Sequence, residues 1–164
     1  MNRLIFGFCL SLVSGAALLF GTCGTSFARS FYLSKNVVQG NQALTACQPG
    51  YHMASLYEII DPSNLTYNTA LGRTSDDSGS GPPDNTGGWI RTGFSSSHDT
   101  TPGQGNCDAW TSNSVSDHGA AGGLNADWAS SATVSGPWSI GGATTCSSER
   151  AVWCMQDVED QNQQ

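Results

Sequence analysis

Positive charge is scarce in this sequence. The 164 residues include six Lys and Arg against thirteen Asp and Glu, and charged residues of both signs make up 12% of the chain. Cleavage of residues 1–28 as a signal peptide would remove one basic and no acidic residue, so the net charge of the mature chain would be 5 − 13 = −8. So few Lys and Arg argue against nucleic acid and anionic membrane surfaces as partners. The abundant Gly, Ser, Thr and Asn are typical of loop-rich extracellular modules.

Motifs for several kinds of chemistry are also missing. The sequence has no close Cys-x-x-Cys pair, no Gly-x-Ser-x-Gly elbow and no His-Glu-x-x-His helix. These absences disfavour a structural zinc site, an α/β-hydrolase and a zinc protease. No Asp-rich spacing supplies the six to eight oxygen ligands that calcium prefers.

The N-terminus has the order of a secretory signal peptide. Arg3 provides a basic start, residues 4–20 are almost unbroken apolar, and residues 26–28 place two small residues two positions apart. We therefore expect cleavage after Ala28 and a secreted, periplasmic or extracellular product without stable membrane insertion. Two alternatives stay open. One is an uncleaved membrane anchor, which the Gly, Ser and Thr residues in the apolar run disfavour. The other is a lipoprotein in which Cys23 is lipidated, but the preceding Phe-Gly-Thr is a poor match to the residues expected before such a cysteine.

Four cysteines remain in the mature chain, and they are Cys47, Cys107, Cys146 and Cys154. An even number in an exported chain predicts a disulfide framework, for which three pairings exist. Zinc held by four thiolates is the alternative. The wide spacing of the cysteines and the export signal favour disulfides.

Local patterning predicts one domain over residues 29–155. Aromatic and β-branched residues predict the strands, which are residues 31–38, 51–55, 89–92 and 151–155. Helix-forming residues predict a short helix over 42–47, which the following Pro-Gly stops. Ser55 is positioned to cap a second helix over 56–60, ended by Asp61 and Pro62.

The rest of the domain is rich in turn residues. Residues 72–88 form a polar loop, which we place within the domain and not between two domains, because a cysteine partner and further aromatic residues lie beyond it. Between residues 107 and 145 we expect Gly-, Ser- and Asn-rich turns that separate widely spaced tryptophans. Residues 156–164 are a polar tail. Asn64 starts an Asn-Leu-Thr sequence, an N-glycosylation site where the source makes such glycans.

The first half of the domain resembles the opening of a C-type-lectin-like domain. In that family a helical cysteine is followed by a Gly-x-His-Leu-Ala-Ser-Ile motif and an acidic helix. Here Cys47 precedes Gly50-Tyr-His-Met-Ala-Ser-Leu and a predicted helix that carries Glu58. Trp89-Ile90 resembles the family's central Trp-Ile-Gly strand.

The second half is similar to the endostatin branch of the same fold. A Cys-x-x-Trp motif at Cys107, a Gly-rich stretch and a closing pair, Cys146 and Cys154, follow in the same order. The resemblance implies an α+β, C-type-lectin-like fold with two short helices near the N-terminus and a small antiparallel sheet with long loops. It also implies the disulfides Cys47–Cys154 and Cys107–Cys146.

The sequence departs from the sugar-binding members of that family at the calcium site. Those members carry a Trp-Asn-Asp motif before the third cysteine, whereas this chain has Trp138-Ser139-Ile140. A Pro82-Pro83-Asp84-Asn85 run lies before Trp89, although the family's proline motif follows that strand. We therefore expect no calcium and no other cofactor.

Three histidines are candidates for chemistry. His52 lies in the fold-forming motif, so we expect it to be a packed structural residue. His98 is next to Asp99, and His118 is next to Asp117. Either pair could join a distant serine in a hydrolase triad, although the many serines make such an assembly unspecific.

Tryptophans divide into an expected core and an expected surface. Trp89, Trp110 and Trp153 are predicted to be buried. The predicted ligand-binding residues lie after Trp89, and they are Arg91, Asp99, Asp127, Trp128 and Trp138. We expect a non-catalytic module that recognises an extracellular or envelope glycan or protein without calcium. A small secreted hydrolase that uses His98 or His118, and a structural envelope or matrix component, are the alternatives.

Overall fold

The computed structural model of the chain describes residues 28–74, 81–83, 86–92, 105–124 and 138–158. The helical elements are the 3-10 helices η1 (Gly40–Thr45) and η2 (Pro62–Asn64) and the short helices α1 (Leu56–Ile59) and α2 (Cys107–Trp110). The strands are β1 (Arg29–Leu33), β2 (Tyr51–Met53), β3 (Leu65–Tyr67), β4 (Gly88–Trp89), β5 (His118–Leu124), β6 (Trp138–Thr145) and β7 (Ala151–Gln156). The expected α+β class is confirmed.

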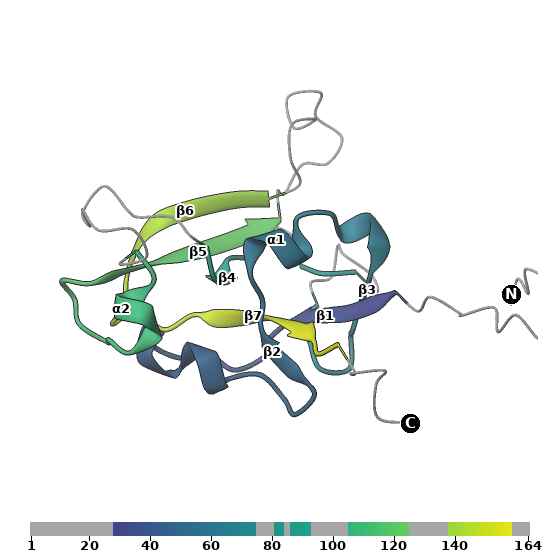
Figure 1. The fold of residues 1–164 in the computed structure, drawn as a ribbon, viewed down its shortest axis with the longest axis horizontal. Helices are drawn as coiled ribbons and strands as arrows, with labels where there is room; N and C mark the ends of the chain where they lie inside the picture. Colours follow the sequence, from purple (N-terminus) through teal and green to yellow (C-terminus); the bar gives the residue numbers. More distant parts are fainter. Residues whose placement is uncertain (1–27, 75–80, 84–85, 93–104, 125–137, 159–164) are drawn as a thin grey trace, which may run out of the picture.

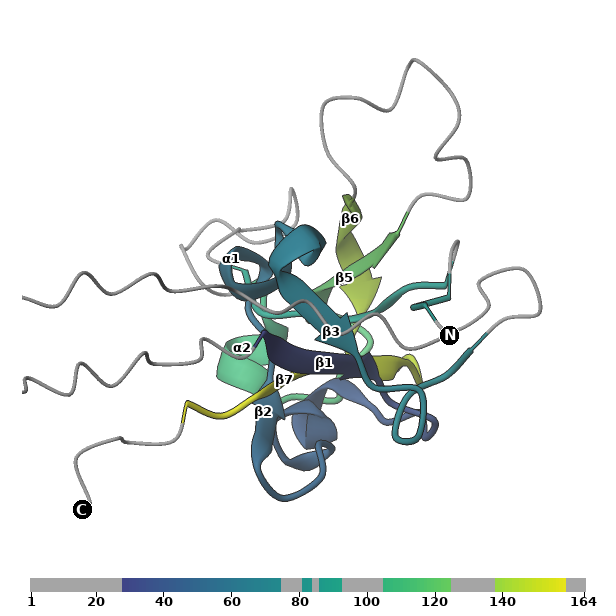
Figure 2. The same ribbon diagram turned by 90° about the vertical axis from the view of Figure 1, so that its right-hand side faces the viewer.

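The strands form one curled, seven-stranded sheet in the order β3-β1-β7-β4-β5-β6, with β2 paired to β7 (Figures 1 and 2). The expectation of a small antiparallel sheet is wrong, because β1 pairs with β3 and β4 pairs with β7 in parallel. A parallel pair needs a long crossover connection. The chain between β1 and β3 supplies one, since it runs through η1, β2, α1 and η2 before it returns to the edge.

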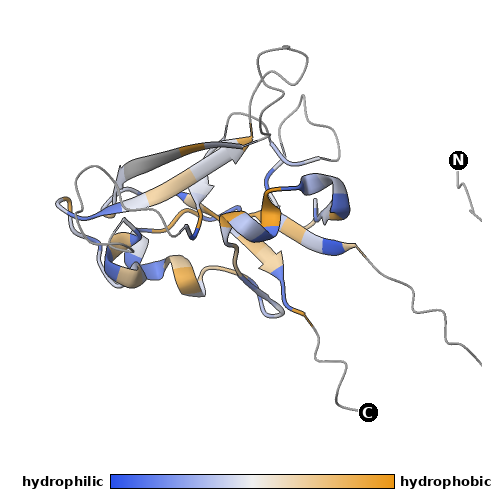
Figure 3. Cartoon of the chain, turned by 45° about the horizontal axis from the view of Figure 1, so that its top comes forward, coloured by the Kyte–Doolittle hydropathy of each residue, from blue (hydrophilic) through white to orange (hydrophobic). Residues whose placement is uncertain are grey.

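β7 organises the core because both of its faces are covered. Trp153 and Met155 point into one apolar cluster, while Val152 and Cys154 point into the other, as the two-residue period of a strand requires. Trp89 and Trp153 are fully buried and Trp110 nearly so, which confirms these three as core residues. In Figure 3 apolar colour appears on the central strands and on parts of the short helices beside them.

Two expected elements are shorter or tighter than the sequence pattern suggests. The predicted strand over 31–38 ends at Leu33, because the hydroxyl of Ser34 donates to the carbonyl of Asn36 and accepts from the N–H of Val152. These bonds compete with the regular ladder. The predicted helix over 42–47 is the 3-10 helix η1, in which Ala46 donates to the carbonyl three residues earlier.

The turns expected between residues 107 and 145 include two of the longest strands. β5 and β6 pair as an antiparallel hairpin with a register shift between Gly119 and Ala121. β5 contains glycine at a position where neighbouring side chains leave no room for a Cβ atom. A Cβ on Gly119 would lie 2.7 Å from the sulfur of Cys107 and 3.0 Å from the ring of Trp89. The glycines make this stretch resemble a loop in the sequence, and their lack of side chains is what allows the strand to pack.

Both expected disulfides are present. Cys47 and Cys154 join η1's end to β7, and Cys107 and Cys146 join α2 to the end of the β5–β6 hairpin. Disulfides are compatible with an extracellular location. Among the described residues, no helix is long and apolar enough to cross a membrane.

Candidate functional site

Glu58 is the residue around which charged side chains gather. It lies on the first turn of α1, and its carboxylate turns back to accept hydrogen bonds from the N–H and the hydroxyl of Ser55, both at 2.8 Å. A Ser at the start of a helix with Glu three positions later is the pattern of a capping box. Local sequence alone therefore orients the Glu58 side chain, without a contribution from residues distant in the chain.

Four residues from elsewhere in the chain complete what we call the Glu58 cluster. The Nε2 of His52, on β2, lies 2.8 Å from Oε1 of Glu58, and its Nδ1 lies 2.6 Å from the carboxylate of Asp157. Arg29, at the start of β1, and Arg91, after β4, approach Glu58 at 3.7 Å and 3.5 Å. The cluster thus consists of Arg29, His52, Ser55, Glu58, Arg91 and Asp157.

These contacts set the charge of Glu58. Partial burial alone raises its pKa, but hydrogen bonds from the N–H of Ser55, the ring of His52 and the hydroxyl of Ser55, together with the charge of His52, lower the pKa to about 2. Glu58 is therefore ionised at any physiological pH. A carboxylate with so low a pKa is a weak general base.

The order of groups differs from that of a serine-hydrolase triad. In a triad the imidazole contacts the serine and the carboxylate lies behind it. Here the carboxylate of Glu58 lies between Ser55 and His52. Within the cluster, Ser55 therefore contacts a carboxylate and not an imidazole.

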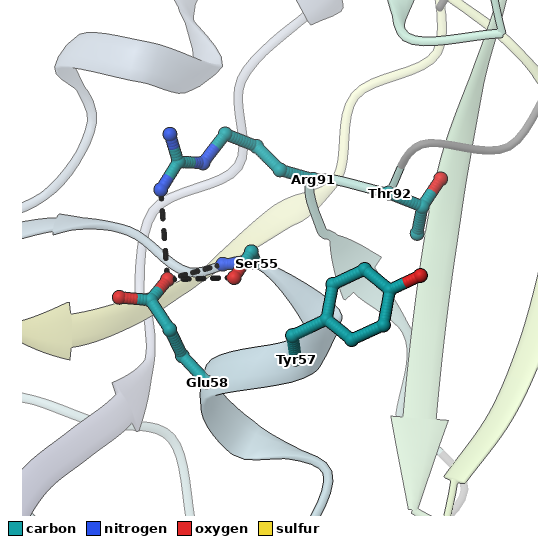
Figure 4. Close-up of a pocket in the computed structure, with 5 residues that line it drawn as sticks. All are labelled: Ser55, Tyr57, Glu58, Arg91 and Thr92. Carbon is teal, nitrogen blue, oxygen red and sulfur yellow. Dashed lines mark hydrogen bonds and ion pairs between the residues drawn. The ribbon is translucent and has the colours of Figure 1, made fainter.

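A pocket opens beside the cluster, and we call it the Arg91 pocket. It has a volume of about 330 Å³ and is lined by Ser55, Tyr57, Glu58, Arg91 and Thr92. The phenol ring of Tyr57 and the guanidinium of Arg91 lie on either side of Ser55 in Figure 4. Tyr57 is 78% exposed, and the Arg91 side chain is 42% exposed. The pocket therefore combines an accessible aromatic ring, an accessible cation and two hydroxyl groups.

The backbone around Arg91 is held on two sides. Arg91 donates its N–H to Ala54 and accepts from Leu56, which ties it to the start of α1. The buried amide of Asn106 then accepts from the N–H of Thr92 and donates to its carbonyl. Asn106 acts as a side-chain substitute for a paired strand residue, so it positions the pocket without lining it.

Only part of the sequence-based site falls on described residues. Arg91, one of the predicted ligand-binding residues, is among the residues that line the pocket. Trp138 lies elsewhere: it is half-buried on β6, donates its indole N–H to the carbonyl of Ile59 and packs edge-on against Trp153. The other expected residues, His98, Asp99, Asp127 and Trp128, lie outside the described residues.

The two remaining histidines have contrasting surroundings. His52 was expected to be a packed structural residue, but its side chain is 34% exposed and bridges two carboxylates. His118 is half-buried at the start of β5. Its neighbour Asp117 accepts hydrogen bonds from the hydroxyl of Ser112 and, through its carbonyl, from Cys146. Within the described segments, no group of three or more His, Cys, Asp or Glu side chains could hold a metal ion.

The site predicted from the sequence did not include Ser55, Tyr57, Glu58, Thr92 or Asn106. The Ser55-x-x-Glu58 spacing was a usable signal for the centre of the cluster. Nothing local indicated the contact between His52 and Asp157, which are 105 residues apart.

No protein-family model matches this chain, and no curated protein or solved structure matches it either.

Proposed function

We propose that this protein is a non-catalytic binding module that recognises a glycan in the Arg91 pocket, outside the cytoplasm and without calcium. The observation that carries the proposal is that Tyr57, a residue that is 78% exposed, lines a pocket that also contains Arg91. A large aromatic ring left so exposed contributes little to folding. It is available to a ligand.

The chemistry of the pocket suits a sugar. A pyranose ring has an apolar face that stacks on an aromatic ring, and its edge carries hydroxyl groups. Arg91 supplies hydrogen-bond donors, and the hydroxyls of Ser55 and Thr92 can both donate and accept. Apolar stacking with a few polar groups that fix orientation is the usual composition of a small-ligand site.

The proposal includes export and a C-type-lectin-like fold. The signal-like N-terminus and the two disulfides support export. The α+β class, the two bridges and the order of elements in the first half support the lectin-like assignment. Recognition without calcium is supported by the absence of the family's Trp-Asn-Asp motif before Cys146.

The test is an array of oligosaccharides probed with the mature chain, with and without EDTA. We expect binding that EDTA leaves intact, that Tyr57→Ala abolishes and that Tyr57→Phe retains, because stacking needs the ring alone. Val115→Ala is the control, since Val115 is 73% exposed but is not among the residues that line the pocket.

Binding to no oligosaccharide would overturn the proposal, and so would binding that Tyr57→Ala leaves unchanged. Release of shortened sugars during the incubation would favour the hydrolase alternative. Retention on an envelope or matrix protein, and on no glycan, would favour a protein-binding or structural role.

A further inference from the structure

We propose that the glycan carries a single carboxylate and that this carboxylate pairs with Arg91; the inference rests on the proposed function of the same pocket. The ligand is then an acidic sugar, in which one acid group stands on an otherwise neutral saccharide. The argument rests on how Arg91 is held, on how Glu58 is satisfied and on the charge of the whole chain.

Arg91 is weakly engaged by its own protein. Its closest described partner is Oε2 of Glu58 at 3.5 Å, which is longer than a charge-assisted hydrogen bond of 2.7–2.9 Å. Its Nε is buried and has no hydrogen-bond partner. Because Nε is buried, a ligand carboxylate would pair with the two terminal nitrogens of this 42% exposed side chain, whose planar N–H groups match the two oxygens of a carboxylate.

Two other arginines show what an engaged side chain looks like in this molecule. Arg73 donates from Nε to Ser34 and from Nη2 to Lys35, both at 2.8 Å, and both acceptors are carbonyls. Arg29 donates from Nε and Nη2 to the carbonyl of Gln156. These side chains hold the backbone together. Arg91 does not, so a ligand can use it without breaking a structural bond.

Glu58 does not depend on Arg91. Its Oε2 accepts two hydrogen bonds of 2.8 Å from Ser55, and its Oε1 lies 2.8 Å from the ring nitrogen of His52. When Arg91 turns to a ligand carboxylate, Glu58 keeps all three short contacts. The exchange of partners at Arg91 therefore leaves no buried charge unpaired.

The charge of the chain limits the ligand to one acid group. The net charge of the mature chain, 5 − 13 = −8, creates an electrostatic field that repels a long polyanion. One carboxylate on a neutral saccharide gains the local contact with Arg91 while it meets little of that repulsion. Tyr57 then stacks on the sugar ring beside the acid group.

The experiment compares matched oligosaccharide pairs. One set contains neutral oligosaccharides and the same molecules oxidised to a uronic acid at one C6, and the other contains singly sialylated oligosaccharides and their desialylated forms. Affinity of the mature chain is measured for each member by titration calorimetry. We expect the acidic member of at least one set to bind about tenfold or more tightly than its neutral partner, as a charge-assisted bidentate contact allows.

Variants test whether Arg91 is responsible. Arg91→Gln should reduce the acid preference to about onefold, and Arg91→Lys should retain part of it, because an ammonium keeps the charge but lacks the planar fork. Lys35→Gln is the matched control: it makes the same change in net charge at an exposed lysine that bonds the carbonyl of Ala70, and it should keep the preference.

The outcomes separate this inference from the proposed function. Equal affinity for both members of every pair, with binding still abolished by Tyr57→Ala, would overturn the acidic ligand and leave the glycan module standing. An acid preference that survives in Arg91→Gln would also overturn the inference. Binding to no oligosaccharide would overturn both proposals.

Discussion

Two regions of the sheet are stabilised in different ways. The Cys47–Cys154 region contains β1, β2, β7 and α1, and large side chains such as Phe31, Tyr32 and Trp153 fill it. The Cys107–Cys146 region contains α2, β5 and β6, and β5 has the sequence HGAAGGL. Neighbouring residues approach β5 closely because its glycines have no side chains. Packing of side chains holds the first region, whereas close backbone approach and a disulfide hold the second.

The backbone of α2 sharpens the contrast. All four residues from Cys107 to Trp110 have positive φ, between 49° and 64°, although none is glycine. Such a left-handed turn costs about 1–2 kcal/mol per residue. The disulfide at its first residue and the packing of Trp110 against Trp89 at its last offset that cost. The comparison teaches that local sequence specifies the first region, while distant contacts impose the second.

The largest expected effects come from removing the disulfides. Cys47→Ala with Cys154→Ala should lower the free energy of unfolding by on the order of 4.7 kcal/mol, and Cys107→Ala with Cys146→Ala by about 3–4.7 kcal/mol. Hydrogen exchange measured by mass spectrometry should then distinguish the regions. The second double variant should lose amide protection in β5 and β6 but keep it in β1 and β7. Uniform loss of protection would contradict the comparison.

Asn106 links the second region to the pocket. Asn106→Ala would remove the two hydrogen bonds that the Asn106 amide makes to the part-buried N–H and carbonyl of Thr92, at a cost of about 1–3 kcal/mol in urea unfolding. Asn113→Ala is the matched control, because it removes the same side-chain amide at an exposed position, where Nδ2 donates to Oε1 of Gln39. It should cost less. Equal stability of wild type and Asn106→Ala would show that the amide does not hold Thr92 in place.

Acid should weaken the first region through Glu58. Because its pKa is about 2 in the folded chain against an ordinary 4.5, the stabilisation is complete above pH 4.5 and is lost as pH falls toward 2. After allowance for partial exposure, the loss is on the order of 2 kcal/mol. Urea unfolding between pH 6 and 2 should show it, and Glu58→Gln should lack that part of the decline. Parallel curves for the two proteins would contradict the assignment.

The smallest expected effect is an increase in stability. Ala109→Gly should stabilise the chain by about 1 kcal/mol, because glycine adopts the positive φ of 55° at lower cost. Ala46→Gly is the control at a negative φ of −79°, and it should destabilise by about 0.5–1 kcal/mol. Thermal unfolding of the pair measures the difference. Destabilisation by both changes would mean that the turn at Ala109 is not left-handed.

Much of the first region could be predicted from the sequence because its signals are local. Ser55 and the following helix over residues 56–59 follow from a short spacing. The Pro49-Gly50 turn also follows, since Gly50 adopts a φ of 82° and Tyr51 donates to the carbonyl of Gln48. The cysteine count alone left three pairings open, and only the family resemblance chose the one observed.

The second region and half of the site could not be predicted, and the reasons are physical. β5 lacks the branched and aromatic residues that indicate a strand, because Gly119 must accommodate Trp89 and a disulfide. The left-handed turn has no glycine to reveal it. In the Glu58 cluster, Asp157 meets His52 only after β2 has paired with β7. Tertiary contacts decide each of these features.

The central claim is that the Arg91 pocket, built on the sequence-specified region, is the ligand-binding site. Titration of isotope-labelled mature chain with the tightest-binding oligosaccharide, followed by amide NMR shifts, tests it most directly. The account predicts the largest shifts at Ser55, Tyr57, Glu58, Arg91 and Thr92, and small shifts along β2 and β3. Shifts concentrated on β6 or around Lys35 and Arg73, with the amides of the pocket unchanged, would contradict it.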